Sequence, residues 1–299
     1  MDPRTVVGTI ALAAVLLACG TEPSRPGDAP ARNGDIVFVR SRGRDAELFV
    51  VDPGTGDERQ LSGGPGMRSS PAWSPDGSRL VFAWRRPEEQ AVAGFNLYVL
   101  DIGTGAVRRL TSGPWIDGAP SWSPDGSRIA FASDRAGPFG VHVVDADGGD
   151  PTRLADGTAP SWSPDGTRIA FARADGATSR IFLMDADGTD VEPLTDGRWN
   201  DRDPAWGPDP SGIAFASDRS GDADLYVVDP GSGSVRRLTT GDGEDAAPAW
   251  SPDGAAVAFG RALGDDFDVW IVDVATGDAR AVTDDPLYDV TPAWGPARA

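Results

Sequence analysis

The chain has 299 residues and a formal net charge of −19, and all of its Lys+Arg cations are arginine. This length is enough for one large domain with a buried core. The acidic balance argues against nucleic acid and against an anionic lipid surface as partners, because both need a basic protein surface.

Residues 1–18 are expected to be a signal peptide outside the fold. Arg4 precedes an apolar run from Val6 to Ala18, which is too short to span a bilayer and suits a signal peptide. The run leads into Leu16-Leu17-Ala18-Cys19-Gly20, which resembles a bacterial lipobox, where cleavage precedes a cysteine that is then acylated. Because Cys19 is the only cysteine, we expect it to be lipidated; an ordinary signal peptide with a chance cysteine is the alternative.

Residues 19–33 are expected to be the lipidated cysteine and a flexible tether, since this stretch is rich in Pro, Gly, Ala and charge. As a coil, the tether would place the following domain about 20 Å from the membrane. We therefore expect an extracytoplasmic, lipid-anchored protein of the cell envelope, held to a membrane only through Cys19.

Residues 34–299 are built from a repeated motif, of which one copy reads PSWSPDGTRIAFA over residues 160–172. Its tryptophans recur every 40 to 49 residues, a period typical of solenoids and propellers. The repeated tryptophans are Trp73, Trp122, Trp162, Trp206, Trp250 and Trp294.

Each repeat predicts four short strands in a fixed order. The first strand ends at the tryptophan, and a Ser-Pro-Asp-Gly stretch, or a variant of it, then predicts a type I turn. Short apolar runs predict the later strands. The second strands are expected at 36–39, 80–83, 129–132, 169–172, 213–216 and 257–260; the third at 48–52, 97–101, 141–145, 181–185, 225–229 and 269–273; the fourth at 59–61, 108–110, 153–154, 193–194, 236–238 and 280–282.

This pattern predicts an all-β fold, a six-bladed β-propeller of four-stranded antiparallel blades over residues 34–299. The N-terminal part lacks a tryptophan strand and the C-terminal part supplies one alone. We therefore expect the C-terminal strand to join the N-terminal blade and close the ring, which leaves no open sheet edge at the seam.

The Trp-Ser-Pro-Asp-Gly repeats resemble the WD40-like propeller repeats of the TolB family of the bacterial envelope. The resemblance covers residues 34–299 and implies the propeller fold, but it does not distinguish between functions, because the same repeats occur in many envelope proteins. Members of that family carry an α/β domain before the propeller, and we do not expect one within the first 33 residues. Similar repeats also occur in prolyl-oligopeptidase-type enzymes, and we do not expect a hydrolase domain after the repeats.

The residues available for catalysis are few. His142 is the only histidine, and it occupies a position that holds Phe, Tyr or Trp in the other repeats, so we expect a packed ring. A Ser-His-Asp triad or a histidine-rich metal site is not expected, and no cofactor is predicted. The acidic stretches 145–150 and 185–190 are compatible with calcium but are interpreted as hairpin turns, because they lack the downstream glutamate of a calcium loop.

The candidate ligand-binding residues lie in the loops before the tryptophan strands. Strand order places these loops and the hairpins between second and third strands at one end of the ring, the expected channel mouth. An aspartate stands five residues before the tryptophan in four repeats, where the other two have Arg68 and Gly157. The candidates are Asp117, Asp201, Asp245 and Asp289, with Asp203, Trp115, Trp199 and Tyr288 beside them.

Two roles for these aspartates stay open. They form a ligand mouth, or they pair with arginines of the facing hairpins and brace the blades. The arginines four residues after the second-strand phenylalanine are Arg42, Arg86, Arg135 and Arg219.

The preferred hypothesis is a monomeric, non-catalytic lipoprotein that binds or scaffolds a protein, peptide or glycan at this mouth. The alternative is a carboxylate-based lyase or hydrolase acting on a sugar-like substrate there. A divalent-cation site in the channel is a third hypothesis. A close carboxylate pair in an open cleft would favour the enzyme, and aspartates locked onto arginines would favour the scaffold.

Overall fold

The computed structural model describes residues 34–87, 94–208 and 212–297, so the predicted signal peptide, Cys19 and the tether lie outside the described residues. Every named element of the described chain is a β-strand. Within these ranges, no helix is long and apolar enough to cross a membrane.

The strands form four-stranded antiparallel sets, and the first set includes the last strand of the chain. In it, β24 (Tyr288–Trp294) pairs with β1 (Ile36–Arg42), which pairs with β2 (Asp45–Val51), and β3 (Glu58–Gln60) completes the set. A single parallel bridge, between Ala46 and Met67, joins this set to the next.

The other sets follow in chain order, each with consecutive strands paired. They are β4 (Met67–Trp73), β5 (Arg79–Arg85), β6 (Asn96–Asp101) and β7 (Val107–Arg109); β8 (Asp117–Trp122), β9 (Arg128–Ser133), β10 (Gly140–Asp145) and β11 (Thr152–Asp156); β12 (Thr158–Trp162), β13 (Arg168–Asp175), β14 (Thr178–Asp185) and β15 (Glu192–Pro193); β16 (Asp201–Trp206), β17 (Ile213–Ser217), β18 (Asp224–Val228) and β19 (Val235–Arg237); β20 (Glu244–Trp250), β21 (Ala256–Leu263), β22 (Asp266–Asp273) and β23 (Ala279–Ala281).

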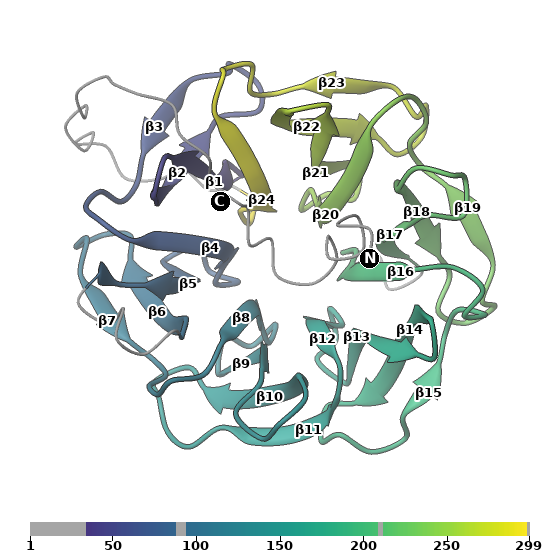
Figure 1. Ribbon diagram of the computed structural model, residues 1–299, viewed down its shortest axis with the longest axis horizontal. Helices are drawn as coiled ribbons and strands as arrows, with labels where there is room; N and C mark the ends of the chain where they lie inside the picture. Colours follow the sequence, from purple (N-terminus) through teal and green to yellow (C-terminus); the bar gives the residue numbers. More distant parts are fainter. Residues whose placement is uncertain (1–33, 88–93, 209–211, 298–299) are drawn as a thin grey trace.

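Figure 1 shows these sets arranged around a common centre, as in a propeller. The strands that end in the repeated tryptophans, which we call the Trp strands, lie innermost. They are β24, β4, β8, β12, β16 and β20, and each contacts the next around the centre.

The Ser-Pro-Asp-Gly stretches form the turns expected of them. In the first copy, the amide of Gly77 donates to the carbonyl of Ser74 at 2.9 Å, which closes the turn. The Asp76 carboxylate accepts hydrogen bonds from the hydroxyl of Ser74 and from the amide and hydroxyl of Ser78. These bonds stabilise the charged form and lower the pKa of Asp76 to about 2.

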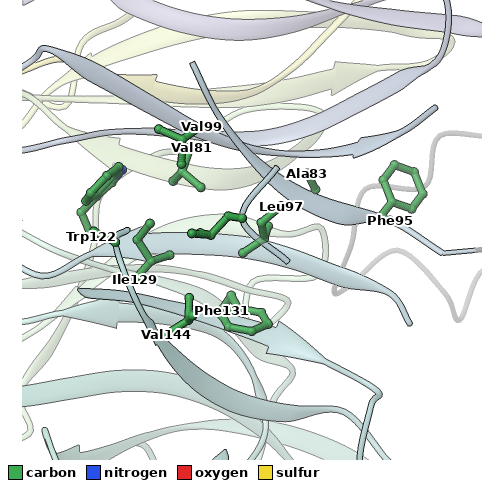
Figure 2. Packing of buried hydrophobic residues seen from close by; sticks show 11 residues of the cluster. Val81, Ala83, Phe95, Leu97, Val99, Trp122, Ile129, Phe131 and Val144 are labelled. Atoms are coloured by element: carbon green, nitrogen blue, oxygen red, sulfur yellow. The ribbon is translucent and has the colours of Figure 1, made fainter. Parts of the chain in front are cut away.

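The core lies between neighbouring sets, because each sheet buries both of its faces. Figure 2 shows one such layer, in which Val81 and Leu97 of one sheet pack against Ile129 and Phe131 of the next, beside Trp122. The second strand of every set contributes a phenylalanine that is at most 1% exposed. These are Phe38, Phe82, Phe131, Phe171, Phe215 and Phe259.

The repeated Trp and Arg of the motif also meet between sets. The guanidinium of Arg128 lies 4.8 Å from the centre of the Trp162 ring in the following set, and Arg79 lies 4.7 Å from that of Trp122. A cation over an indole face is a favourable contact. The motif therefore encodes contacts between neighbouring sheets as well as a turn.

Candidate functional site

The loops before the Trp strands and the hairpins between second and third strands lie at the same end of the fold. The amide of Ile116, just before β8, donates to Asp134 of the β9–β10 hairpin at 2.8 Å. The amide of Asn200, just before β16, makes the same bond to Asp218 at 2.9 Å. We call this end the mouth face.

Asp117 and Asp201 begin their Trp strands at equivalent positions on this face, and both are fully buried. Arg135 donates to both carboxylate oxygens of Asp117, at 2.8 and 2.7 Å, and Ser133 adds a third bond at 2.6 Å. Arg219 donates to Asp201 at 2.8 Å. These two arginines are among those that the sequence offered as bracing partners.

Asp245 and Asp289 are equally buried, but their partners come from a different position. Arg261 holds Asp245 through two hydrogen bonds of 2.7 and 2.8 Å, and Arg40 holds Asp289 through two of 2.8 and 2.6 Å. These arginines stand two residues after the second-strand phenylalanine rather than four. These two partners were not predicted, because the predicted arginines all stand four residues after the phenylalanine.

Arg42 and Arg86 do not pair with the aspartates as the sequence allowed. Instead, Arg42 lies over the Phe49 ring at 5.8 Å and Arg86 over the Trp84 ring at 4.7 Å. Arg68 stands at the aspartate position of the β4–β7 set. Its guanidinium lies 4.3 Å from the centre of the Trp84 ring and donates to backbone carbonyls.

The third-strand rings serve as platforms for the paired arginines. The guanidinium of Arg40 lies 4.8 Å from the centre of Phe49, that of Arg219 4.7 Å from Tyr226 and that of Arg261 4.9 Å from Trp270. Stacking fixes the plane of each guanidinium, which preorganises the two-pronged bonds of Arg40 and Arg261 and the single bond of Arg219.

We call Asp117, Asp201, Asp245 and Asp289 the rim aspartates. Burial is the largest influence on the pKa of two of them, Asp245 and Asp289. It raises the pKa of Asp289 to about 7, with the charge of Asp285 adding to the rise and Arg40 opposing it. Burial also raises the pKa of Asp245, against the opposing hydrogen bonds from Arg261. None of the four rim carboxylates is exposed by more than 1%, so each is directed at its arginine and not at solvent.

Asp203 lies deeper, three residues before Trp206, at a bulge where its φ is 52°. Every Trp strand has a non-glycine residue with positive φ at this position. The Asp203 side chain keeps 24% exposure, Arg202 is 3.9 Å away, and the backbone of Ala247 in the next Trp strand hydrogen-bonds it. Burial raises its pKa.

The aromatic candidates are also on the mouth-face loops. Trp115 is 38% exposed and Trp199 is 41% exposed, which is unusual for tryptophan in this protein. Tyr288 is half-buried, with its ring 5.2 Å from that of Phe267. The two tryptophans therefore offer open ring faces beside a rim of buried ion pairs.

Other candidates resolve into local structure. His142 is 1% exposed, lies 5.7 Å from the Phe131 ring and bonds the carbonyl of Gly140 through Nδ1. Asp187 accepts bonds from the amide and hydroxyl of Thr189, as a hairpin turn requires. In the described part of the chain, no group of three or more His, Cys, Asp or Glu residues is placed to hold a metal ion.

The fold is that of a β-propeller, in which short antiparallel sheets are arranged around a common centre. A family model described as the TolB beta propeller domain matches residues 26–158 and 155–299, and the chain belongs to that family. No curated protein matches it significantly.

Solved structures show the same fold. TolB from Acinetobacter baumannii superposes with a TM-score of 0.77 at 22% identity, over 88% of this chain and 67% of that one. A putative TolB from Agrobacterium tumefaciens superposes with a TM-score of 0.70 at 21% identity, over 89% of this chain and 100% of that one. An oligogalacturonate lyase in complex with manganese superposes with a TM-score of 0.58 at 18% identity, over 83% of this chain and 73% of that one.

Proposed function

We propose that this protein is a non-catalytic envelope lipoprotein whose propeller binds or scaffolds a protein, peptide or glycan at the channel mouth. The propeller in this proposal has six blades and spans residues 34–299, after a signal peptide (1–18) and a lipidated tether (19–33). The pairing of β24 with β1 supports closure, because it joins the two ends of the repeat array in one sheet.

The observation that carries the proposal is the state of the rim aspartates. Asp117, Asp201, Asp245 and Asp289 are buried and locked onto arginines. Such pairs brace neighbouring strands and leave no carboxylate open for acid–base chemistry. The exposed rings of Trp115 and Trp199 then provide the contact surface, since exposed aromatic side chains are typical of binding sites.

The enzyme alternative, a lyase or hydrolase on a sugar-like substrate, has weaker support. Similarity to an oligogalacturonate lyase is a likeness of fold at 18% identity. Carboxylate catalysis would need a pair of carboxylates facing the substrate, and the rim carboxylates face arginines instead.

The test is affinity capture of envelope partners on the purified full-length protein. The double variant Trp115→Ala/Trp199→Ala should lose most of the bound partner at an unchanged melting temperature. The control is Val107→Ala/Val191→Ala, which also trims two exposed apolar side chains but lies away from the mouth-face loops. Equal capture by wild type and the tryptophan double variant would contradict a mouth-face binding site.

The lipid anchor is tested separately. Cys19→Ala should move the protein from the membrane fraction to the soluble fraction, because the acyl chains are the proposed attachment. If Cys19→Ala still resists carbonate extraction from membranes, the lipobox interpretation is wrong.

A further inference from the structure

The rim contains one arginine without its carboxylate. Arginines stand two residues after the second-strand phenylalanine in three sets, as Arg40, Arg173 and Arg261. Arg40 and Arg261 each hold a rim aspartate through two hydrogen bonds. In the β12–β15 set, the aspartate position is Gly157, so Arg173 lacks the acceptor that its two counterparts have.

The guanidinium of Arg173 is nevertheless held as its counterparts are. It lies 3.7 Å from the centre of the Phe182 ring, the third-strand platform of its own set. It is half-buried, and across the described ranges we find no hydrogen bond or ion pair made by its side chain. A stacked guanidinium with open donors is a preorganised carboxylate receptor.

The surroundings of Arg173 leave its charge unbalanced. Directly across the sheet, Arg40 faces Glu47 and Arg261 faces Asp268, whereas Arg173 faces Arg180. Asp175, the nearby carboxylate, is taken by Arg180 at 2.6 Å. Two arginines opposite one another repel, so an added anion would relieve the repulsion.

The mouth-face connection into the Trp strand is also short in this set. A single residue, Gly157, connects β11 to β12, whereas the corresponding connections elsewhere run over residues 61–66, 110–116, 194–200, 238–243 and 282–287. Gly157 has a φ of 146°, and a Cβ there would lie 2.5 Å from the Phe171 ring. The backbone thus turns tightly and supplies neither a covering loop nor a side chain.

The neighbouring mouth-face loop, residues 194–200, carries the exposed ring of Trp199. Residues 194–200 pack on the β13–β14 hairpin, where the hydroxyl of Thr178 donates to the carbonyl of Gly197 at 2.8 Å. Ser179 forms a bridge with Asn200, the residue that follows Trp199. A ligand that reaches Arg173 from the mouth face would therefore pass beside the Trp199 loop.

We propose that Arg173 is a binding residue for a single carboxylate of a peptide partner, either a C-terminal carboxylate or one Asp or Glu side chain. This inference rests on the proposed mouth-face binding function and names the chemistry that is recognised. The ligand carboxylate takes the place that Asp245 and Asp289 fill for Arg261 and Arg40, as two parallel N–H···O bonds.

A peptide fits the charges better than a polyuronic glycan. Arg40 and Arg261 already have internal carboxylate acceptors, so among these three equivalent positions only Arg173 offers a receptor for one carboxylate. A chain of uronates would bring further negative charges to a protein with a net charge of −19, without cations to meet them.

The test uses two matched probes, acetyl-Ala-Ala-Phe with a free carboxylate and the same peptide as its C-terminal amide, with trigalacturonate as the glycan probe. Binding is followed by NMR through the Nε–H resonances of ¹⁵N-arginine in the folded protein. The peptide with the free carboxylate should shift the Nε–H resonance of Arg173, which is identified by its disappearance in Arg173→Gln. The shift should reach saturation as the peptide concentration rises. Arg173→Gln should weaken binding at least about tenfold, which is the loss of one charge-assisted interaction.

Arg198→Gln is the control, since it removes an exposed arginine from the adjacent loop and changes net charge equally. It should leave probe binding within about twofold. Arg173→Gln should also leave thermal unfolding nearly unchanged, whereas Arg261→Gln should lower the melting temperature by leaving Asp245 buried without its partner.

Equal binding of the carboxylate and amide peptides, or no binding of either, would overturn the inference. An equal loss of affinity for the carboxylate peptide in Arg173→Gln and Arg198→Gln would also overturn it. Saturable binding of trigalacturonate, with no binding of the peptide, would do the same. If Trp115→Ala/Trp199→Ala abolishes partner capture while Arg173→Gln has no effect on the probes, the inference fails and the proposed function stands. If Arg173 binds the carboxylate probe while Trp115→Ala/Trp199→Ala captures as much partner as wild type, the inference stands and the proposed function fails.

Discussion

At the scale of single residues, the same positions in the repeat serve different purposes in different sets. A rim aspartate and an arginine form a buried ion pair in four sets, while Arg68 bonds backbone carbonyls and Arg173 keeps open donors. A buried ion pair contributes little net stability, yet removing one partner is costly because the other charge stays buried.

This asymmetry predicts the effect of Asp117→Ala. The variant should lower the free energy of unfolding by about 3 kcal/mol, because Arg135 would lose both of its hydrogen bonds to that carboxylate. Urea denaturation measures the change. Asp278→Ala, at an exposed turn, is the control and should stay within about 0.5 kcal/mol of wild type. Similar values for the two variants would show that the rim pairs do not brace the fold.

His142 should behave as a packed ring and not as a functional base. Burial lowers its pKa, which favours the neutral form. His142→Phe should therefore change stability by no more than about 1.5 kcal/mol and leave partner capture intact. It should also remove the loss of stability that protonation causes as pH falls below about 6.5. A folded variant that loses partner binding would contradict this assignment.

At the scale of elements, β24 lies in the sheet of the N-terminal strands, as the sequence led us to expect. It pairs with β1 along Ile36 to Ser41, and it contacts both β20 and β4 on either side. The Trp294 indole also donates to the carbonyl of Gly34 at 2.8 Å. The strand therefore connects the first and last repeats through main-chain and side-chain bonds.

Truncation before Tyr288 should destabilise the whole array, because it exposes the edge of β1 and the apolar faces of two neighbouring sets. We expect a lower melting temperature and aggregation during purification. Truncation after Gly295 removes only four residues and should melt like the full chain. A chain lacking β24 that unfolds at the wild-type temperature would rule out the proposed closure.

At the scale of the whole molecule, the carboxylates fall into two classes with opposite pH behaviour. Turn aspartates have lowered pKa values, about 2 for Asp76 and Asp125, because hydroxyls and amides hold their charged forms. Asp203, Asp245 and Asp289 have raised pKa values because they are buried, and that of Asp289 is about 7. The first class lies at one end of the fold and the second at the mouth face or the Trp strands.

These two classes predict a stability maximum in mildly acid solution. The turn aspartates contribute stability above pH 4 that is lost as pH falls towards 2, because their folded pKa is below the unfolded value. Asp289 contributes stability below pH 4 that is lost as pH rises through about 7, because its folded pKa is higher. Urea denaturation should therefore give the highest free energy of unfolding near pH 4 to 5.

Asp289→Asn isolates the second effect. It should flatten the decline between pH 4 and 7, where one pKa unit corresponds to about 1.4 kcal/mol. Asp278→Asn, which removes the same charge at an exposed turn, should keep the wild-type slope. An unchanged slope in Asp289→Asn would show that the carboxyl is already ionised through this range.

The sequence by itself determined the all-β repeat, the turns and the end of the fold at which the candidate loops lie. These features follow from local chemistry: Ser-Pro-Asp-Gly closes a turn on itself, short apolar runs form strands, and strand order fixes which loops share an end. The exposure of Trp115 and Trp199 agrees with their positions outside the strand pattern.

Only the tertiary structure decided which arginine meets which aspartate. Arg135 and Arg219 were among the expected partners, but Arg40 takes the place of Arg42. Asp245 pairs with Arg261, in a set that has Leu263 at the expected position. Side-chain partners depend on strand register, on the ring beneath each guanidinium and on what occupies the facing position, and none of these is local in sequence. The same reason explains why Arg173 stands out only in three dimensions: the position of its missing partner is taken by Gly157, which connects β11 to β12.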